Sequence, residues 1–432
     1  MTSPVSEVSS PVGHDRKTSP RDQVALLSRG AAELHVSLEL EERIAESQKT
    51  GVPLRVKAGF DPTRPDLHFG HAVVLAKMRQ FQDLGHKIIL LVGDFTAMVG
   101  DPTGASDLRP RLSRAQVMEA AGTYTTQAFK ILDERETEIR HNSEWLDKLT
   151  TTEVVELMAK MTVSRMLERN DFGERFAAHK PIYQHEFLYP LLQAYDSVAL
   201  KCDIELGGTD QLFNLLLGRD LMPKYGLRGQ MVLTTPLLEG TDAKLEEGKI
   251  VGKKMSKSAG NYIGLLDAPL DMFRKVMQVD DQVIFRYFEL LSRKPAAEVE
   301  ALKEEQAAGG DARRTKALFA RELIERFHSR EAAEKAEAEF TRVYANDAVP
   351  DDVPTHTVRT EGASVWIAKA LSSAGLVKST SDGKRLVEQG GVELDRVRVT
   401  DANLQLARGG PYLVRVGSKN RRFAYILVTS LA

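Results

Sequence analysis

The stretch that decides the fold reads Lys57-Ala58-Gly59-Phe60-Asp61-Pro62-Thr63-Arg64-Pro65-Asp66-Leu67-His68-Phe69-Gly70-His71. It predicts a buried strand, a turn with two prolines, and a helix that opens at two histidines three positions apart. The first turn of a helix carries unpaired N–H groups and the positive end of the helix dipole. We therefore expect an anion, most often a phosphate, to bind there. Gly70 between the histidines lets a flat group such as a purine approach the backbone without meeting a Cβ.

The sequence on either side extends this stretch into a βαβ unit. We expect a strand over 54–60, a helix over 70–84 that ends at Gly85, and a second strand over 87–92. The second strand is a continuous apolar run, which is typical of a central parallel strand. The unit predicts an α/β fold with a doubly wound parallel sheet that binds ligands at the carboxyl ends of its strands. The following loop, 93–104, places three glycines and two carboxylates at that edge.

Composition excludes several classes of protein. The chain has 432 residues, enough for two to four domains. Its one cysteine, Cys202, excludes an internal disulfide and argues against a cysteine-rich metal site, so we expect no structural metal. No apolar run approaches the roughly 20 residues that span a bilayer, and the N-terminus lacks a signal-peptide pattern. We therefore expect a cytoplasmic protein without membrane contact.

Charge is distributed unevenly along the chain. The formal net charge is only −2, but residues 364–432 contain eleven Lys and Arg against five Asp and Glu. Such asymmetry indicates an attached nucleic-acid-binding module at the C-terminal end.

A basic loop far along the chain complements the histidine pair. Alone, the histidines form a weak metal-site candidate, because no cysteine or third histidine lies at ligand spacing. Residues 253–260 read Lys253-Lys254-Met255-Ser256-Lys257-Ser258-Ala259-Gly260. Lysines in such a loop can clamp a polyphosphate and neutralise the charge that develops as pyrophosphate leaves.

Together the two motifs resemble the paired signatures of the class I aminoacyl-tRNA synthetases. His68-Phe69-Gly70-His71 corresponds to the HIGH motif, and Lys254 to Ser258 is a complete KMSKS motif. The resemblance implies ATP bound between the motifs, accompanying Mg²⁺, and an aminoacyl-adenylate intermediate. It further implies that His68, His71 and Thr63 act on the phosphates, that Lys254 and Lys257 close over the pyrophosphate, and that Gly70 and Asp61 help to bind ATP.

A predicted helix around residues 189–196 indicates which amino acid the site binds. Tyr189, Gln193 and Asp196 fall at i, i+4 and i+7, on one face. Polar groups on an otherwise apolar helix need partners, and a ligand with a phenol and an ammonium group would supply them. A Gly-rich turn, 205–211, follows before another helix and again offers a carboxylate and an amide.

Both stretches resemble the tyrosyl-tRNA synthetase pattern. The resemblance implies that Tyr189, Gln193 and Asp101 hold the amino group of tyrosine and that Asp196 accepts its phenol hydroxyl. Asp210 corresponds to the aspartate that holds the ATP ribose, and Gln211 to a glutamine near the reacting carboxylate.

Three positions depart from the common pattern of that family. Lys57 stands where many members carry a second tyrosine that shares the phenol hydroxyl, Glu205 stands where others have glutamine, and Ala105 stands where others have lysine. The ammonium group of Lys57 either reaches the Asp196 region or points elsewhere. The departures resemble a separate bacterial branch of the family.

The C-terminal residues resemble a small RNA-binding fold shared with a ribosomal small-subunit protein. Basic residues in this segment are expected to meet RNA phosphates: Lys378, Lys384, Arg385, Arg396 and Arg398. The whole resemblance implies a Rossmann-like doubly wound sheet, then a helical domain, then a small α+β RNA-binding domain. The expected boundaries are a disordered tail at 1–20, a catalytic domain with a helical insertion at 21–265, a helical anticodon-side domain at 266–345, a linker at 346–362 and the RNA-binding domain at 363–432.

The resemblance thus implies a tyrosine-specific ligase whose partners are L-tyrosine, ATP and tRNA(Tyr). It also implies a homodimer, and we expect its interface within the helices of 114–170. Three alternatives remain at this point. The tryptophanyl enzymes share both motifs, a related nucleotidyltransferase would lack the lysine loop, and a catalytically inactive RNA-binding scaffold would lack intact motif residues.

Overall fold

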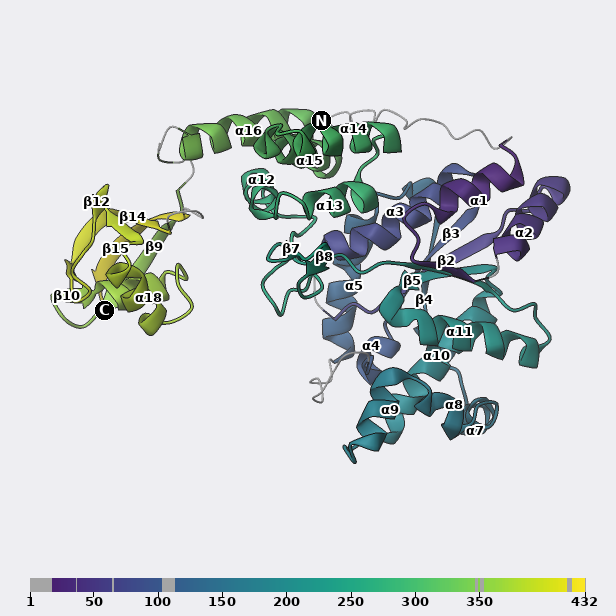
Figure 1. Ribbon diagram of the computed structural model, residues 1–432. Helices are drawn as coiled ribbons and strands as arrows, with labels where there is room; N and C mark the ends of the chain where they lie inside the picture. The colour runs from purple at the N-terminus through teal and green to yellow at the C-terminus, as the bar shows by residue number, and fades with distance from the viewer. Residues whose placement is uncertain are drawn as a thin grey trace, which may run out of the picture. The chain divides into compact units, whose positions relative to one another are not determined.

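A six-stranded sheet forms the centre of the N-terminal unit of the computed structural model (Figure 1). The structure describes residues 18–35, 37–63, 66–102, 113–345, 349, 353–417 and 422–431. In spatial order the strands are β1 (Glu33–His35), β6 (Met231–Thr235), β5 (Ile204–Gly208), β2 (Arg55–Phe60), β3 (Lys87–Val92) and β4 (Thr137–His141). All neighbours are parallel except β1 and β6. The predicted doubly wound sheet is therefore confirmed.

Strand order reverses between β2 and β5. From β2 the chain moves outward through β3 and β4, then returns to place β5 and β6 on the other side of β2. Open parallel sheets bind ligands at such a switch point, outside the carboxyl ends of the strands. The predicted βαβ unit is β2, α3 (Phe69–Asp83) and β3, and Gly85 adopts a φ of 86° directly after the helix.

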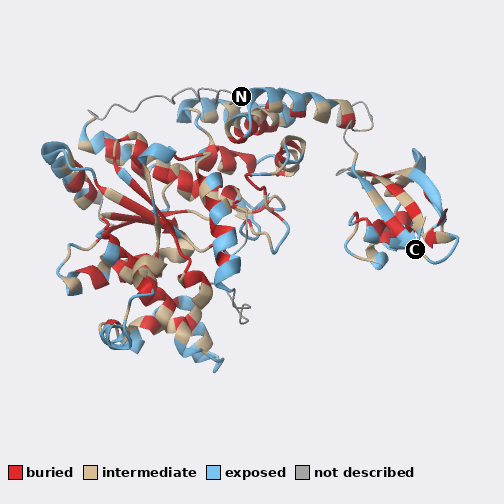
Figure 2. Cartoon of the chain, turned by 180° about the vertical axis from the view of Figure 1, so that it is seen from behind, coloured by how far each residue is buried: buried red, intermediate tan, exposed pale blue. Residues whose placement is uncertain are grey.

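Helices cover both faces of this sheet. Helix α3 packs on β2, β3 and β5 from one face, whereas α10 (Gln184–Leu200) and α11 (Leu212–Leu221) pack together on the other (Figure 1). Figure 2 shows the strands between them as buried. The other helical elements up to this point are α1 (Pro20–Ser28), α2 (Ser37–Thr50), α4 (Thr96–Val99), α5 (Arg114–Ala128), η1 (Glu134–Glu136), α6 (Ser143–Leu146), α7 (Thr151–Ala159), α8 (Val163–Leu167), α9 (Asn170–Ala177), η2 (Thr209–Gln211) and η3 (Met222–Tyr225).

One strand interrupts the segment 114–170, which we predicted as mostly helical. Edge strand β4 pairs with β3 through residues 137–141. Its sequence, Thr-Glu-Ile-Arg-His, contains one apolar residue, and none of its residues is fully buried. An edge strand of this composition lacks the apolar run that identified β3.

Beyond β6 the chain forms a hairpin and then a helical layer. The hairpin strands are β7 (Lys244–Glu246) and β8 (Lys249–Val251), and the helices are α12 (Pro269–Gln278), α13 (Ile284–Leu291), α14 (Ala296–Ala307) and α15 (Ala312–Phe327). Helix α13 packs against α3, so this layer supports the helix that opens at the histidine pair. No helix among the described residues is long and apolar enough to cross a membrane.

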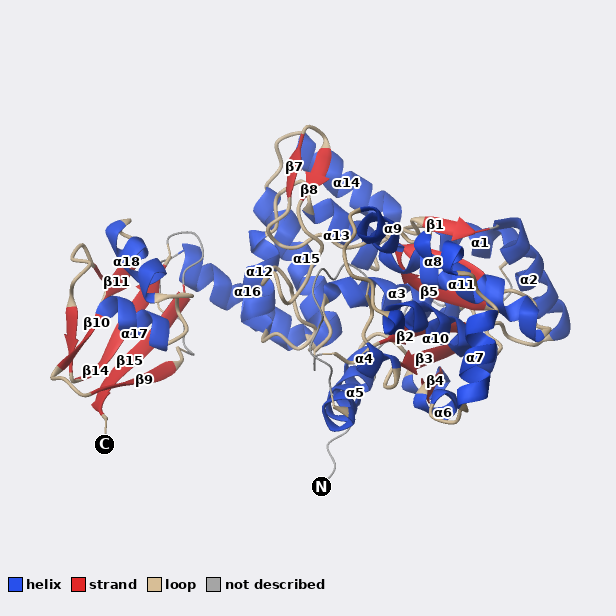
Figure 3. Ribbon diagram, turned by 90° about the horizontal axis from the view of Figure 1, so that it is seen from below, coloured by secondary structure: helices blue, strands red, loops and turns tan. Residues whose placement is uncertain are grey.

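The chain divides into two compact units, Met1–Arg330 and Glu331–Ala432. The second unit contains α16 (Arg330–Ala345), β9 (Thr355–Thr360), β10 (Ser364–Trp366), α17 (Ile367–Ser373), α18 (Thr380–Glu388), β11 (Val392–Leu394), β12 (Val397–Arg398), β13 (Gln405–Ala407), β14 (Gly409–Val416) and β15 (Arg422–Ser430). Its five-stranded sheet has the order β12-β11-β14-β15-β9 and shares an apolar core with α17 (Figure 3).

Two predicted boundaries differ from the structure. Residues 355–360, which we assigned to the linker, form β9, which pairs in parallel with β15. Only Val358 of β9 is buried, so its sequence carries little strand signal. At the other end, residues 1–17 of the predicted tail lie outside the described residues, and helix α1 already begins at Pro20.

Candidate active site

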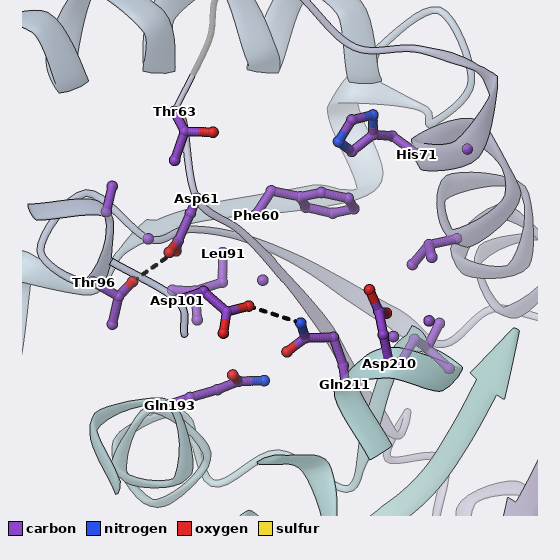
Figure 4. A pocket seen from close by; sticks show the side chains of 18 of the residues that line it. Phe60, Asp61, Thr63, His71, Leu91, Thr96, Asp101, Gln193, Asp210 and Gln211 are labelled. Carbon is purple, nitrogen blue, oxygen red and sulfur yellow. Dashed lines mark hydrogen bonds between the residues drawn. The ribbon is translucent and has the colours of Figure 1, made fainter. Parts of the chain in front are cut away.

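One cavity of about 750 Å³ lies at the carboxyl ends of the central strands (Figure 4). It is lined by every residue that we predicted to bind tyrosine or ATP: Asp61, Thr63, His68, Gly70, His71, Asp101, Tyr189, Gln193, Asp196, Asp210, Gln211, Lys254 and Lys257. These residues come from segments almost two hundred positions apart in the chain. The fold therefore unites the two signature motifs and the predicted amino-acid residues in one site.

The histidine pair caps α3 through its own imidazoles. The Nδ1 atom of His68 accepts the Gly70 N–H at 3.1 Å, and the Nδ1 atom of His71 accepts the His68 N–H at 3.2 Å. Both Nδ1 atoms are acceptors, so each neutral ring carries its proton on Nε2. Burial lowers the pKa of His68 to about 2 and that of His71 to about 4. The pair therefore presents neutral Nε2–H donors.

This capping changes the predicted anion site. We expected unpaired backbone N–H groups at the start of α3, but the Phe69 N–H bonds to the Ile263 carbonyl and the Gly70 N–H bonds to His68. The donors that remain for a phosphate are imidazole N–H groups. Gly70 is required for a further reason, since a Cβ there would lie 2.9 Å from Cε1 of His68.

The lysine loop is tied to acidic residues across the cavity. Lys254 Nζ lies 2.9 Å from Oδ2 of Asp210, and Lys257 Nζ lies 3.6 Å from Oδ2 of Asp66 and bonds to the Asp66 carbonyl. Met255 between them is buried and anchors the loop through a backbone bond to Leu238. Both signature lysines thus face the cavity, and Asp210 is engaged by one of them.

Asp61 is a partly buried residue whose carboxylate lies near the amino-acid residues. Its Oδ1 accepts the Thr96 hydroxyl at 2.8 Å, and its Oδ2 accepts the Tyr189 hydroxyl at 3.0 Å. Burial, with a smaller effect from the neighbouring carboxylates Asp101 and Asp196, raises the pKa of Asp61 to about 7 against the opposing effect of these two bonds. A cationic group entering this part of the cavity would favour the ionised carboxylate.

Asp196 is held by two residues that we did not predict. Its Oδ1 accepts the Trp145 Nε1–H at 2.8 Å, and its Oδ2 accepts from Asn142 Nδ2 at 3.3 Å. Burial raises the pKa of Asp196 to about 7 despite the opposing effects of Lys57 and these two donors. Our argument that the polar face of α10 needs a ligand to satisfy it was therefore wrong, because protein groups already satisfy it.

An amide chain links Gln193 to Asp101. Asn214 Nδ2 donates to Oε1 of Gln193 and to Oε1 of Gln211, both at 3.0 Å. Gln211 Nε2 then donates to Oδ2 of Asp101 at 2.9 Å (Figure 4). Arg169, almost fully buried, lies 3.6 Å from the other oxygen of Asp101. These hydrogen bonds fix the orientation of the Gln193, Asn214 and Gln211 carboxamides, that is, where each oxygen and each NH₂ group points.

Lys57 pairs with Glu205, which we did not predict as its partner. Its Nζ lies 3.1 Å from Oε1 of Glu205, and both side chains are almost completely buried. Two of the three departures from the common family pattern are thus partners of one another, and the third, Ala105, lies outside the described residues.

Sequence reasoning missed Asn142, Trp145, Asn214 and Arg169. Asn142 and Trp145 follow β4, the strand that we also missed, so their place beside Asp196 could not be inferred. Asn214 lies three residues after Gln211 at the start of α11, and this spacing was the only available signal.

The five predicted RNA-binding residues are all exposed on the C-terminal unit. Arg385 pairs with Asp382 at 2.8 Å, and Lys384 lies 3.8 Å from Glu388. Arg396 occupies the two-residue turn between β11 and β12, where it and Asp395 both have positive φ values. This turn holds Arg396 at a protruding tip.

Comparison with known proteins agrees with this arrangement. Residues 49–345 match the family model of the class I tRNA synthetases (W and Y), and residues 365–410 match the S4 domain. The tyrosine–tRNA ligase of Geobacter sulfurreducens is 49% identical over 94% of this chain and 99% of its own length. That of Bordetella pertussis is 51% identical over 93% of this chain and 95% of its own length.

Solved structures share the fold at lower identity. A mitochondrial tyrosyl-tRNA synthetase of Coccidioides posadasii superposes with a TM-score of 0.60 at 23% identity, covering 75% of this chain and 92% of that one. The tyrosyl-tRNA synthetase of Archaeoglobus fulgidus, solved with L-tyrosine, gives 0.56 at 24% identity over 73% and 99%. With the family match and the close bacterial relatives, the chain belongs to the tyrosine–tRNA ligase family of class I tRNA synthetases.

Proposed function

We propose that the protein activates L-tyrosine with ATP to form tyrosyl-adenylate and pyrophosphate, and then transfers the tyrosyl group to the 3′ end of tRNA(Tyr). The observation that carries this proposal is the single cavity lined by both signature motifs and by the tyrosine-binding set. The substrate carboxylate attacks the α-phosphate directly. Catalysis then comes from alignment and charge stabilisation, because no side chain has to form a covalent bond.

We assign the buried end of the cavity to tyrosine. Asp196 accepts a hydrogen bond from the phenol hydroxyl while it keeps its bonds from Trp145 and Asn142, because each carboxylate oxygen has two lone pairs. The ammonium group is received by acceptors nearby, namely Asp101, Tyr189 and Gln193, and Gln211 lies near the reacting carboxylate. Asp61, bonded to Tyr189, contacts the adenylate where the amino acid meets the phosphate.

We assign the end beside α3 and the lysine loop to ATP. The Nε2–H groups of His68 and His71 and the hydroxyl of Thr63 bind the phosphates, and Gly70 leaves room for the adenine. Lys254 leaves Asp210 so that this carboxylate can hold the ribose. Lys254 and Lys257 then neutralise the departing pyrophosphate.

Mg²⁺ is proposed as a companion of ATP. The described residues contain no group of three or more His, Cys, Asp or Glu positioned to hold a metal. Mg²⁺ is commonly bound mainly by substrate phosphates and water, so it needs no protein cage here. It would supply positive charge to the β- and γ-phosphates as pyrophosphate forms.

The C-terminal unit is proposed to bind tRNA through Lys378, Lys384, Arg385, Arg396 and Arg398. The S4-domain match at 365–410 and the exposure of all five side chains support this assignment. Phosphate contacts of this kind set affinity and its salt dependence more than sequence choice. Because charged tRNA is consumed in translation, we propose a cytoplasmic location.

A second copy of the chain is proposed to cover the helices of 114–170 and the segment that follows. Several large apolar side chains are exposed there, including Val155, Met158, Val163 and Phe176. Exposed apolar side chains that gather in one patch mark an interaction surface, whereas single exposed apolar side chains are common on any protein. Sedimentation equilibrium should give twice the chain mass, and Val155→Glu should shift the protein towards the monomer.

The experiment that tests the main proposal is ATP–pyrophosphate exchange with each of the twenty amino acids. Exchange with tyrosine alone is expected. Exchange with tryptophan would indicate the related synthetase, and no exchange with any amino acid would indicate an inactive RNA-binding protein.

A further inference from the structure

The Lys57–Glu205 ion pair lies directly under the proposed tyrosine site. The two residues face each other in register on the parallel strands β2 and β5, where the strand order reverses. Their side chains are 0% and 1% exposed, yet both residues line the cavity. The pair is therefore part of the cavity floor rather than of the apolar core beneath it.

Stability alone does not account for such a pair. Removing two charges from water costs several kcal/mol for each ion, and a buried ion pair is often no better than a neutral pair of the same size. Burial alone would lower the pKa of Lys57, but Glu205, Cys202 and Asp196 raise it above its ordinary value. Lys57 therefore stays cationic and balances the charge of Glu205.

Glu205 acts only as a hydrogen-bond acceptor towards the side chains around it. It accepts hydrogen bonds from Gln193 Nε2 at 3.3 Å, from the Ser197 hydroxyl at 3.1 Å and from Gln230 Nε2. Lys57 adds a second contact to the same helix, since its Nζ lies 3.5 Å from the Gln193 carbonyl. A carboxylate cannot donate, so Gln193 must turn its NH₂ group towards Glu205 and its oxygen away.

The carboxylates at the two ends, Glu205 and Asp101, together set the direction of the amide chain, because neither can donate. The oxygen of Gln193 accepts from Asn214, Asn214 also donates to Gln211, and the NH₂ group of Gln211 donates to Asp101. A neutral glutamine in place of Glu205 could donate as well as accept, so it would permit the reversed orientation of Gln193. That orientation would present an NH₂ group, rather than an oxygen, to a substrate ammonium.

We propose that Lys57 and Glu205 are a positioning pair, which holds the Gln193 carboxamide with its oxygen towards the ammonium group of the substrate. This inference rests on the proposed function, because it assigns Gln193 to that ammonium. Lys57 provides the countercharge that lets Glu205 act as an obligate acceptor in a buried site.

The test uses the neutral double variant Lys57→Met/Glu205→Gln in the full-length protein, because each single variant leaves a buried charge unpaired. Binding is measured for tyrosine and for 3-(4-hydroxyphenyl)propanoate, which has the same phenol and carboxylate but no ammonium group. We expect the Kd for tyrosine to rise about tenfold, the scale of one lost hydrogen bond to a charged group. The Kd for the analogue and the KM for ATP should change less than twofold.

Equal weakening of both ligands would overturn the proposal, because it would mean that the pair supports the pocket as a whole. Unchanged tyrosine binding would overturn it as well. The exposed pair of α16, altered as Lys335→Met/Glu331→Gln, is the matched control and should leave all three constants unchanged. Failure of the proposed function would be seen separately, as absence of tyrosine-dependent exchange in the unaltered protein.

Discussion

The carboxyl group of Asp61 predicts an unusual dependence of stability on pH. Its pKa is raised from 3.8 to about 7 in the folded protein, chiefly by burial, whereas the unfolded chain keeps the ordinary value. Between about pH 4 and pH 7 the folded protein therefore binds more protons than the unfolded chain. The free energy of unfolding should fall as pH rises through this window, the reverse of the usual behaviour of a paired carboxylate.

The size of the effect follows from the shift. A difference of about three pKa units corresponds to roughly 4 kcal/mol when the group is fully ionised, which is an upper limit. The variant Asp61→Asn removes this titration but keeps the size of the side chain, and the Thr96 and Tyr189 hydroxyls can rotate to meet the amide. The variant should therefore lose less stability than the parent between pH 5 and pH 8. The stability of Asp61→Asn should still fall with rising pH, but with a smaller slope, because the pKa of Asp196 is raised as well.

Urea unfolding without ligands, followed by tryptophan fluorescence, measures this difference. Trp145 bonds to Asp196 in the catalytic cavity and so reports on the unit that contains Asp61. Asp271→Asn, at a largely exposed carboxylate paired with Arg274, is the control and should keep the slope of the parent. Parallel curves for Asp61→Asn and the parent would show that the carboxyl group is not desolvated as we describe.

Three further predictions concern catalysis, specificity and RNA binding. Lys257→Ala should slow adenylate formation in stopped-flow experiments more than it weakens tyrosine binding, and the opposite order would argue against its action on pyrophosphate. Trp145→Phe removes a donor to Asp196 and should reduce the preference for tyrosine over phenylalanine in pyrophosphate exchange by about tenfold; an unchanged preference would contradict this role. Lys378→Gln should lower the slope of log affinity for tRNA against log salt by about 1; an unchanged slope would remove Lys378 from the RNA contacts.

Local sequence patterns predicted those parts of the fold in which one segment carries its own signal. The apolar run of β3 and the glycine after α3 marked the central βαβ unit to within one residue at each end. Strands β4 and β9 were missed because each lies at a sheet edge and is nearly devoid of buried residues. Their stability comes from pairing with β3 and β15, which no local pattern encodes.

The candidate site shows the same division. Residue types and motifs predicted the residues that line the cavity, but not the partners that hold them. Trp145 and Asn142 reach Asp196 only because β4 is adjacent to β3. Lys57 and Glu205, separated by 148 positions in the chain, become neighbours only through the strand order of the sheet.

The two ends of the cavity differ in the charged residues that line them. Asp61, Asp101 and Asp196 lie at the buried end, where Lys57 pairs with Glu205. The lysine loop lies at the more exposed end. An amino acid is a zwitterion, so in the proposed function this field would turn its ammonium group inwards and its carboxylate towards the phosphates.

The histidine pair explains how the phosphate end avoids an excess of fixed charge. The two imidazole rings lie 4.0 Å apart and are both neutral, because burial lowers the pKa of each. In the proposed function they would donate hydrogen bonds to the phosphates of ATP without adding positive charge to that end of the cavity. Positive charge at this end is carried by Lys254 and Lys257, which pair with Asp210 and Asp66. In the proposed function these two lysines would move to the pyrophosphate as it leaves.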